Sequence, residues 1–297
     1  MNKGGLCIFG EVLFDHFPDG KRVLGGAPLN VAWHLQAFGQ APHFISRVGN
    51  DAEGEVIREA IQDWGMDSTG LQADPERPTG KVMVSFENGE PTYDIVENCA
   101  YDAVDEATVA ASTAQPGFLY HGSLALRSET SRRALHYLET SAPHTVFVDV
   151  NLRPPWWQRD QVLEMLRHAN WVKLNRDELD LLGRDAGNHL LDPAAFLREH
   201  DLRGLVLTLG ASGAELHTQE SAPIRVKPRG NIDKVDTVGA GDAFASVMIL
   251  GLLKQWPLEL TLQRAQDFAS EIVGHRGATV SDRAFYRRFA EEWKLEH

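Results

Sequence analysis

Short β-rich segments alternate with helical patterns over most of this chain, and this alternation limits the fold more than any other feature. Runs rich in Val, Ile, Leu and Phe predict strands at Leu6–Phe9, Phe44–Val48, Phe118–His121, Val146–Asn151, Trp171–Leu174 and Leu205–Leu209. Apolar spacing and end signals predict helices at Pro28–Phe38, Asp51–Trp64, Ser128–Thr140, Arg159–His168, Arg176–Leu182, Pro193–His200, Gly241–Lys254, Leu258–His275 and Asp282–Lys294. Such an alternation favours an α/β fold with a mainly parallel sheet flanked by helices.

Two segments depart from this alternation. Residues 81–96 alternate apolar and polar side chains on both sides of Asn88-Gly89, a strong turn signal, and so predict a β-hairpin. Residues 12–24 contain a second pair of extended runs around a Pro-Asp-Gly turn. We expect the two hairpins, at about 12–24 and 80–100, to form a small sheet that serves as a lid over the core. The alternative is an edge extension of the main sheet.

Composition restricts the class of protein. The chain has 297 residues, 43% of them hydrophobic, which suits one folded domain over residues 1–297 with the lid inserted in it. A net charge of −13 disfavours nucleic acid or an anionic membrane as the main partner. Two cysteines without metal-like spacing predict buried free thiols and a cytoplasmic protein. Neither a signal peptide nor a membrane-spanning segment is expected.

Residues 235–244 read Val-Asp-Thr-Val-Gly-Ala-Gly-Asp-Ala-Phe and combine a glycine loop, a carboxylate and the start of an apolar helix. Backbone N–H groups of Gly239, Ala240 and Gly241 are expected to converge at the positive end of that helix. Such a helix start binds anions, and glycines allow a phosphoryl group to approach the backbone closely. This loop therefore predicts chemistry on a phosphate.

Asp242 follows this loop, and two interpretations of it stay open. Its carboxylate could accept the proton of a hydroxyl group presented to the same anion site, which would make it a general base for phosphoryl transfer. It could instead be an N-cap, since Asp is a favoured capping residue.

A second glycine pair precedes a helix near the N-terminus. Gly25 and Gly26 allow close backbone contact, and the Asn30 amide can accept and donate hydrogen bonds to sugar hydroxyls. Asp15 is the natural partner, because an ionised carboxylate accepts from two adjacent hydroxyls. An ordinary turn and a solvated acid at a strand end are the alternatives.

Three strand ends in the middle of the chain carry further polar groups. Asn175 and Glu178 suit a hydrated Mg²⁺, but their spacing is also that of a capping box. Arg153 follows a strand ending near Asp149, and could hold a phosphate or pair with that carboxylate. Thr208–Gly213 suits a loop against a nucleotide, or a plain hairpin into the residues that follow.

Taken together, these motifs resemble the ribokinase-like, or PfkB, family of carbohydrate kinases over nearly the whole chain. Gly25-Gly26 with Asn30, Asn175-x-x-Glu178 and Asp236-Thr237-x-Gly239-Ala240-Gly241-Asp242 carry the resemblance. Bacterial fructokinases of that family are most similar. The motifs shared with them are Gly25–Asn30, Ser46–Asp51, Glu97–Asp102, Gly122–Ala125 and Asp149–Arg153. The resemblance implies a three-layer α/β/α core with a small β-sheet lid.

It also implies roles for individual residues. Asp242 would be the catalytic base, beside an anion hole made by Gly239, Ala240 and Gly241. The residues implied for the sugar are Asp15, Gly25, Gly26, Asn30, Ser123 and Arg153. Those implied for ATP, Mg²⁺ and phosphate are Asn175, Glu178 (to Mg²⁺ through water), Thr208, Gly210, Gly213, Ser270 and Gly277, with the loop from Ser270 to Gly277 near the adenine. Many relatives also bind K⁺, here at positions Asp236, Val238, Ile272, His275, Gly277 and Ser281. A homodimer formed through the lid is a further implication.

One departure bears on the substrate. Ala27 stands where a ribokinase has lysine, so fructose is favoured over ribose, and sugar phosphates are disfavoured because the predicted sugar side has no Lys and Arg cluster. The leading hypothesis is an ATP-dependent kinase acting on a hydroxymethyl group of a small neutral sugar, fructose first. The first alternative is the same chemistry on another acceptor: ribose, a nucleoside, or a sugar acid such as 2-keto-3-deoxygluconate. Arg127 and Arg153 keep a carboxylated substrate in consideration. The others are a sugar-sensing module and a nicotinamide dehydrogenase, which the absence of an early Gly-x-Gly-x-x-Gly disfavours.

Overall fold

The computed structural model describes residues 5–87, 90–111, 116–141, 144–185, 187–229 and 235–295. The chain divides into two compact units. Unit 1 consists of Met1–Gly117, Ala125–Pro143 and Thr279–His297, and unit 2 consists of Phe118–Leu124 and His144–Ala278. The single domain over residues 1–297 stays a prediction.

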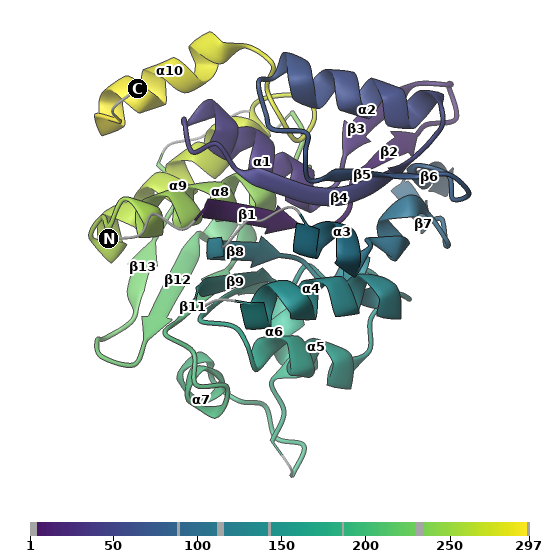
Figure 1. Ribbon diagram of the computed structural model, residues 1–297. Coiled ribbons are helices and arrows are strands. Elements are labelled where there is room, and N and C mark those ends of the chain that lie inside the picture. Colours follow the sequence, from purple (N-terminus) through teal and green to yellow (C-terminus); the bar gives the residue numbers. More distant parts are fainter. Residues whose placement is uncertain are drawn as a thin grey trace. The chain divides into compact units, whose positions relative to one another are not determined.

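Unit 2 is built on a mainly parallel run of strands. Its strands are β8 (Pro116–His121), β9 (Thr145–Asp149), β10 (Trp171–Asn175), β11 (Gly204–Thr208), β12 (Ala214–Thr218) and β13 (Ile224–Val226). They follow one another in the order β13-β12-β11-β10-β9-β8, and β8 to β11 are parallel. β12 and β13 run antiparallel to their neighbours, and Figure 1 shows β11, β12 and β13 side by side. The parallel strands all end at one edge, which is where α/β sheets bind ligands.

The helices of unit 2 pack on these strands. They are α5 (Arg159–Leu166), α6 (Arg176–Leu182), α7 (Pro193–Glu199), α8 (Ala240–Leu253) and α9 (Leu258–Val273). α6 packs on β10, α7 on β11 and β12, and α9 on β12, β13 and α8. α8 is buried from Ala243 to Gly251, as its almost uninterrupted apolar sequence predicts.

The described part of unit 1 contains a second parallel group of strands and five α-helices. The strands β1 (Gly5–Phe9), β4 (His43–Gly49) and β5 (Leu71–Asp74) are parallel in the order β1-β4-β5. The helices are α1 (Ala27–Ala37), α2 (Ala52–Asp63), α3 (Glu106–Ala111), α4 (Glu129–Ser141) and α10 (Arg283–Trp293). α1 packs on β1 and β4, and α2 packs on β4. The Asp51 side chain caps α2 by accepting a hydrogen bond from the Gly54 N–H at 2.8 Å.

The C-terminal helix belongs to unit 1 because aromatic side chains hold it there. His34 of α1 hydrogen-bonds the Tyr286 hydroxyl of α10 at 3.0 Å, and Trp33 stacks on Trp64 with ring centroids 4.5 Å apart. The guanidinium of Arg283 lies over the Trp64 ring, 4.6 Å from its centroid. Helix α10 is therefore packed against α1 and the residue that follows α2.

A separate four-stranded sheet completes unit 1. Its strands are β2 (Leu13–His16), β3 (Arg22–Gly25), β6 (Gly80–Glu87) and β7 (Glu90–Ile95), in the order β3-β2-β6-β7. Both predicted hairpins are present as antiparallel pairs, and β2 joins β6 in parallel. The edge extension of the main sheet is therefore the wrong alternative. The predicted turn Asn88-Gly89 lies outside the described residues.

Most predicted elements are confirmed within one or two residues, and the differences have simple causes. β9 ends at Asp149 rather than Asn151, since Asn151 has a φ of 41° that no strand allows. The sequence analysis missed β5, β13 and α3, which are short and offer little periodicity.

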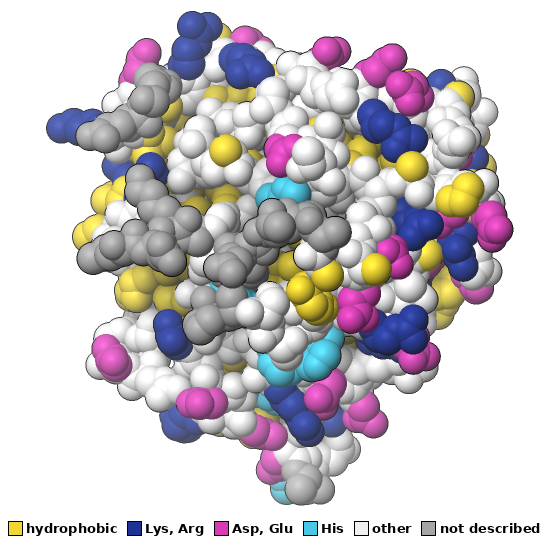
Figure 2. Space-filling model, in the orientation of Figure 1, with side chains coloured by type: hydrophobic (Ala, Val, Ile, Leu, Met, Phe, Trp, Pro, Cys, Tyr) yellow, Lys and Arg dark blue, Asp and Glu magenta, His cyan; other side chains and the backbone are white. Residues whose placement is uncertain are grey.

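Three observations bear on the predictions made from composition: the state of the cysteines, the surface charges and the length of the helices. Cys7 and Cys99 are free and buried, as predicted, and burial raises the pKa of the Cys7 thiol to about 12. Figure 2 shows Lys and Arg side chains mixed with Asp and Glu on the face in view. Within the described ranges, none of the helices is long and apolar enough to span a membrane.

Candidate active site

The start of helix α8 excludes one of the two interpretations of Asp242. The helix begins at Ala240, one residue before the predicted start, and its N-cap is Gly239 without a side-chain cap. Asp242 is therefore the third helical residue, and the N-cap interpretation is wrong. Its carboxylate belongs to the first turn, beside backbone N–H groups that an α-helix leaves without intrahelical partners.

Gly239 is required by both its backbone angle and its surroundings. Its φ of 80° lies in the left-handed region, and an added Cβ would lie 2.3 Å from the Cα of Ala278. The carboxylate of Asp236 fixes the same loop, because its two oxygens accept hydrogen bonds from the N–H groups of Val238 at 3.0 Å and Gly277 at 3.1 Å. The segments 236–241 and 277–278 thus form one packed loop pair.

The predicted convergence of three free N–H donors needs one correction. The Ala240 N–H donates to the Thr237 carbonyl at 3.4 Å, whereas the Ala243 N–H makes the first regular helical bond to Gly239 at 2.9 Å. A hydrogen bond of 3.4 Å is long and weak. An anion at this helix start would compete with it readily.

A buried ion pair missed by the sequence analysis lies next to this helix start. Parallel pairing of β9 and β10 places Lys173 beside Asp149, and the Lys173 ammonium donates to both oxygens of that carboxylate at 2.8 and 2.9 Å. The Lys173 ammonium also lies 3.4 Å from where a Cβ of Gly241 would be. The Asp149 partner is thus Lys173, so the predicted alternative that Arg153 pairs with Asp149 is wrong, and Arg153 is exposed.

Glu178 is held in place by the backbone. It forms the predicted capping box with Asn175: the Asn175 side chain accepts from the Glu178 N–H, and Glu178 Oε2 accepts from the Asn175 N–H, both at 2.8 Å. Its Oε1 accepts from the Leu152 N–H at 2.8 Å. Burial raises the pKa of Glu178, and these bonds and the Lys173 charge offset the rise only in part.

Charges around Lys173 make this part of the unit negative. Burial by itself lowers the pKa of Lys173, but Asp149, Glu178 and Asp242 raise it above its ordinary value. Three carboxylates around one ammonium give a formal charge of −2. A site of this kind attracts a divalent cation.

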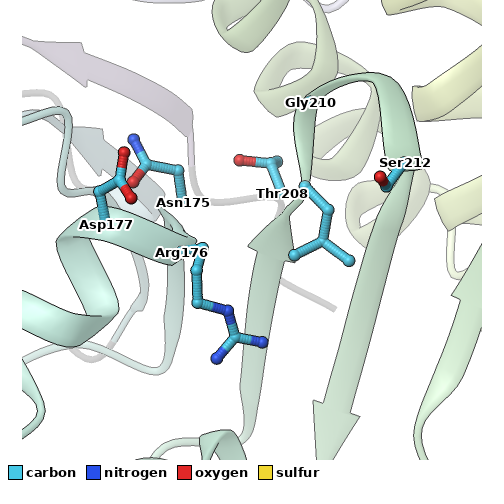
Figure 3. A pocket seen from close by; sticks show the side chains of 7 residues that line it. Asn175, Arg176, Asp177, Thr208, Gly210 and Ser212 are labelled. Carbon is cyan, nitrogen blue, oxygen red and sulfur yellow. The ribbon is translucent and has the colours of Figure 1, made fainter.

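A pocket of about 400 Å³ opens beside these residues. Asn175, Arg176 and Asp177 line one side, and Thr208, Leu209, Gly210 and Ser212 line the other (Figure 3). Parallel pairing of β10 and β11 sets Asn175 next to Thr208. The structure therefore brings Asn175, Thr208 and Gly210 together as the resemblance implied. Arg176, Asp177 and Ser212 were not predicted, because only the folded strand ends show what faces the space.

Gly213, which was predicted to border the nucleotide, lies in the turn between β11 and β12. It closes the β11–β12 turn, where its N–H donates to the Gly210 carbonyl at 3.1 Å and its carbonyl accepts from the Leu209 N–H at 2.8 Å. The plain hairpin is thus present, with its turn at the pocket. Gly213 supports the loop but is not among the pocket-lining residues.

The remaining predicted residues of unit 2 are spread more widely. Ser123 is buried and donates to the Asn151 carbonyl at 3.5 Å. Ser270 lies inside helix α9 rather than in a loop, and its hydroxyl donates to the Gln266 carbonyl at 2.8 Å. The Ile272 carbonyl accepts from the His275 N–H at 2.8 Å. Ser281, the last position implied for K⁺, belongs to unit 1.

Unit 1 holds four of the six residues predicted to bind sugar, and the other two, Ser123 and Arg153, belong to unit 2. Asp15 of β2 and Gly25 of β3 lie together, because an added Cβ on Gly25 would be 3.5 Å from Asp15 Oδ2. Gly26 has a φ of 111°, and an added Cβ would lie 2.5 Å from the Glu11 carbonyl oxygen. Asn30 is buried in the first turns of α1, where its N–H donates to the Gly26 carbonyl at 2.9 Å. The structure therefore gathers the four predicted residues around one strand end and one helix start.

Cationic side chains of the small sheet lie on the face opposite Asp15. Successive residues of a strand point to opposite faces, so Asp15 and His16 are on different sides of β2. The carboxylate of Glu53 in α2 pairs with Arg22 at 3.1 Å and Lys81 at 3.4 Å and lies 3.0 Å from the imidazole of His16, and all three side chains are on the His16 face. These charges are turned away from the predicted sugar side.

The guanidinium of Arg127 is held by hydrogen bonds to other residues of unit 1. Its guanidinium donates to both oxygens of Asp102 at 2.7 and 2.8 Å, to the Tyr101 hydroxyl at 2.9 Å and to the Val96 carbonyl at 2.6 Å. Such a bidentate pair with a carboxylate is strong and directional. Arg127 therefore ties together the segment after β7 and the turn that precedes α4.

The match to a protein-family model decides the family. Residues 8–284 match the model described as "pfkB family carbohydrate kinase". The chain belongs to this family. The predicted resemblance is thus confirmed, the protein is a sugar kinase, and the dehydrogenase interpretation is wrong.

Individual relatives of this kinase act on different acceptors, as their names state. Escherichia coli fructokinase is 29% identical over 83% of this chain and 84% of its own. Aminoimidazole riboside kinase of Salmonella typhimurium is 28% identical over 85% of this chain and 81% of its own.

A solved structure supports the fold. Vibrio cholerae fructokinase, in a form with fructose, ADP and calcium ion bound, is 25% identical and superposes with a TM-score of 0.81 over 99% of both chains. The predicted ribokinase-like α/β fold, with a mainly parallel sheet and a smaller sheet, is thereby confirmed.

Proposed function

We propose that this kinase transfers the γ-phosphate of ATP to a hydroxymethyl group of a small neutral sugar, with fructose as the leading acceptor. The observation that carries the proposal is the position of Asp242 in the first turn of α8, in a chain of the pfkB carbohydrate kinase family. The E. coli and V. cholerae fructokinases support fructose.

Asp242 is proposed as the general base. It accepts the proton of the sugar hydroxyl as that oxygen attacks the γ-phosphorus, and the bond to the β-phosphate oxygen breaks so that ADP leaves. The N–H groups of Gly239, Ala240 and Gly241, with the helix dipole, stabilise the negative charge of the transferred phosphoryl group. Asp15, Gly25, Gly26 and Asn30 hold the sugar, and Ser123 and Arg153 are proposed as further contacts.

The nucleotide is proposed to bind in the pocket of unit 2. Asn175, Thr208 and Gly210 border it directly, Gly213 shapes the turn, and Ser270 and Gly277 are assigned to the adenine side. A 400 Å³ space is within the range of small-molecule sites. The V. cholerae neighbour, with ADP in its structure, supports this assignment.

The residues fit a hydrated Mg²⁺. Glu178 keeps the second lone pair of each oxygen for a metal-bound water, and the cluster around Lys173 has a formal charge of −2. Asn175 and Glu178 would hold the ion through water, and the ion would neutralise phosphate charge during transfer.

The loop pair of segments 236–241 and 277–278 also fits K⁺. Asp236 lies beside Val238 and Gly277, whose backbone carbonyls are hard oxygen donors like its own carboxylate, and the carbonyls of Ile272 and His275, near the end of α9, are proposed as further donors. Ser281, the remaining position that the resemblance implies for K⁺, belongs to unit 1. Asp236 would then bind K⁺ in addition to holding the two segments together.

Two features of unit 1 favour a neutral acceptor. The cationic side chains of the small sheet face Glu53 rather than the Asp15 side, which disfavours sugar phosphates. Arg127 is bound to Asp102, which removes one of the two arginines that kept a carboxylated sugar in consideration. A riboside is the second candidate acceptor, because the Salmonella relative is named for one.

The experiment is ATP consumption coupled to ADP detection, with Mg²⁺ and K⁺ present. The acceptors are fructose, ribose, 2-keto-3-deoxygluconate, adenosine, aminoimidazole riboside and fructose 1- or 6-phosphate. We expect saturable turnover with the highest kcat/KM on fructose. A higher value on another acceptor would correct the substrate, and a folded protein inactive on all of them would contradict the proposal.

Replacing Asp15 tests the sugar side. Asp15→Ala removes an acceptor of sugar hydroxyl bonds, so we expect the sugar KM to rise about 10- to 100-fold, the loss of one or two hydrogen bonds to a charged group. The KM for ATP should change less than about twofold by the same reasoning. Asp19→Ala, in the turn between β2 and β3, is the matched control. An unchanged sugar KM in Asp15→Ala would remove this residue from the site.

We further propose a cytoplasmic homodimer formed through the four-stranded sheet, which would also serve as the lid. Phe86 and Tyr93 are 56% and 54% exposed, and pairing places them on the same face as Val84 and Asp15. Exposed aromatic residues are enriched in interfaces. Sedimentation equilibrium of the whole chain measures the assembly state.

The buried free thiols of Cys7 and Cys99 agree with the reducing compartment that is proposed for this protein.

A further inference from the structure

Lys173 of the buried strand β10 forms a buried ion pair with Asp149. Its side chain is 8% exposed and its partner Asp149 is 2% exposed. Taking two charges out of water costs several kcal/mol for each ion, and well-packed apolar residues of similar volume are often equally or more stabilising. Because a buried ion pair costs this much desolvation, we expect the pair of Lys173 and Asp149 to have a role other than stability.

The position of the Lys173 ammonium indicates that role. It lies 3.4 Å from where a side chain of Gly241 would begin, so it occupies the space beside the second residue of α8. The negative charges of Glu178 and Asp242, in addition to that of Asp149, raise the pKa of Lys173. Asp149 fixes the ammonium in place by accepting two hydrogen bonds, and so holds it beside the start of α8.

We propose that Lys173 is a positioning residue for phosphoryl transfer: anchored by Asp149, its ammonium orients the Asp242 carboxylate and adds positive charge beside the backbone that receives the γ-phosphate. This inference rests on the proposed function of Asp242 and α8. It assigns Lys173 no contact with the sugar. The effect therefore falls on kcat and on recognition of the γ-phosphate, and leaves the sugar KM nearly unchanged.

A four-protein comparison separates this role from simple stability. The proteins are the wild type, Lys173→Met, Asp149→Asn and the double variant. Lys173→Met leaves a buried Asp149 carboxylate without its partner, so its melting temperature should fall strongly. The double variant removes both charges and should regain most of that loss. Thermal unfolding of the four proteins measures this part.

Turnover gives the decisive comparison. We expect Lys173→Met to lower kcat on the order of 10- to 100-fold, somewhat less than the loss of a direct donor to the reacting charge, in both the wild-type and the Asp149→Asn backgrounds. The sugar KM should change less than about threefold in each case. Lys254→Met, at the other end of α8, is the matched control and should leave kcat unchanged. A stable double variant with the kcat of Asp149→Asn would show that the pair is only structural.

A binding measurement keeps the inference independent of the acceptor. Calorimetric titration with ATP and with ADP, without sugar, yields the ratio of the two affinities for each protein. We expect Lys173→Met to lower the preference for ATP over ADP about three- to tenfold in the Asp149→Asn background, because only ATP carries the γ-phosphate. An unchanged ratio would overturn the inference even if the sugar panel revealed no acceptor. Wild-type inactivity with a changed ratio would contradict only the proposed reaction.

Discussion

Asp242→Asn should lower kcat about 10²- to 10⁴-fold, the usual contribution of a general base. The amide has the size of the carboxylate but cannot accept the proton of the attacking hydroxyl. Asp242 does not cap α8, whose N-cap is Gly239, so the helix should form normally in the variant. Steady-state kinetics with the best acceptor of the panel measure the effect, and the sugar KM should stay within about threefold.

Asp160→Asn is the matched control for this substitution. Asp160 is exposed in the first turn of α5, so the control removes a carboxylate from the first turn of a helix outside the proposed site. Its kcat should equal that of the wild type. Near-normal turnover of a folded Asp242→Asn protein would exclude Asp242 as the base.

Gly239→Ala should reduce kcat by about 10²-fold or more, because the backbone donors at the start of α8 would be displaced. A non-glycine residue at a φ of 80° is strained, and the new Cβ would lie 2.3 Å from the Cα and 2.4 Å from the Cβ of Ala278. The loop pair must therefore open to admit the methyl group. The same kinetic assay measures kcat, and circular dichroism verifies that the variant is folded.

Gly39→Ala separates backbone strain from displacement of the loop. Gly39 has a φ of 72°, but a Cβ added there meets nothing within 4 Å. This control should lose about 1 kcal/mol or slightly more of stability while keeping its kcat. Equal kcat losses in both variants would mean that Gly239 acts through general stability rather than through the anion site.

Sequence patterns were sufficient where local physics decides the structure. The αL glycine before an apolar run marked the start of α8 to within one residue, and the alternation of Val82 and Val84 with exposed neighbours marked β6. The spacing of Asn175 and Glu178 correctly indicated a capping box. In each case the relevant partners lie within a few residues along the chain, so their spacing alone specifies the contact.

Motif order also identified the family, which the match over residues 8–284 confirms. The residues proposed for the sugar, ATP and metals came from the same motifs. Their assignment to ligands stays a prediction, because a motif names the residues that a family uses without showing which acceptor binds.

Long-range contacts, by contrast, were decided only by the tertiary structure. Lys173 meets Asp149 because two parallel strands pair in one register, and a shift of one residue would have turned the ammonium to the other face. Arg127 was available to a carboxylated sugar in the sequence and is bound to Asp102 in the fold. Gly239 needs its glycine partly because Ala278, distant in sequence, packs against it. The sequence by itself thus determined the family and most of the elements, since these depend on motif order and local spacing, and it named the candidate site residues. Which charges remain free to act was determined by strand register and packing, which join residues far apart in the chain.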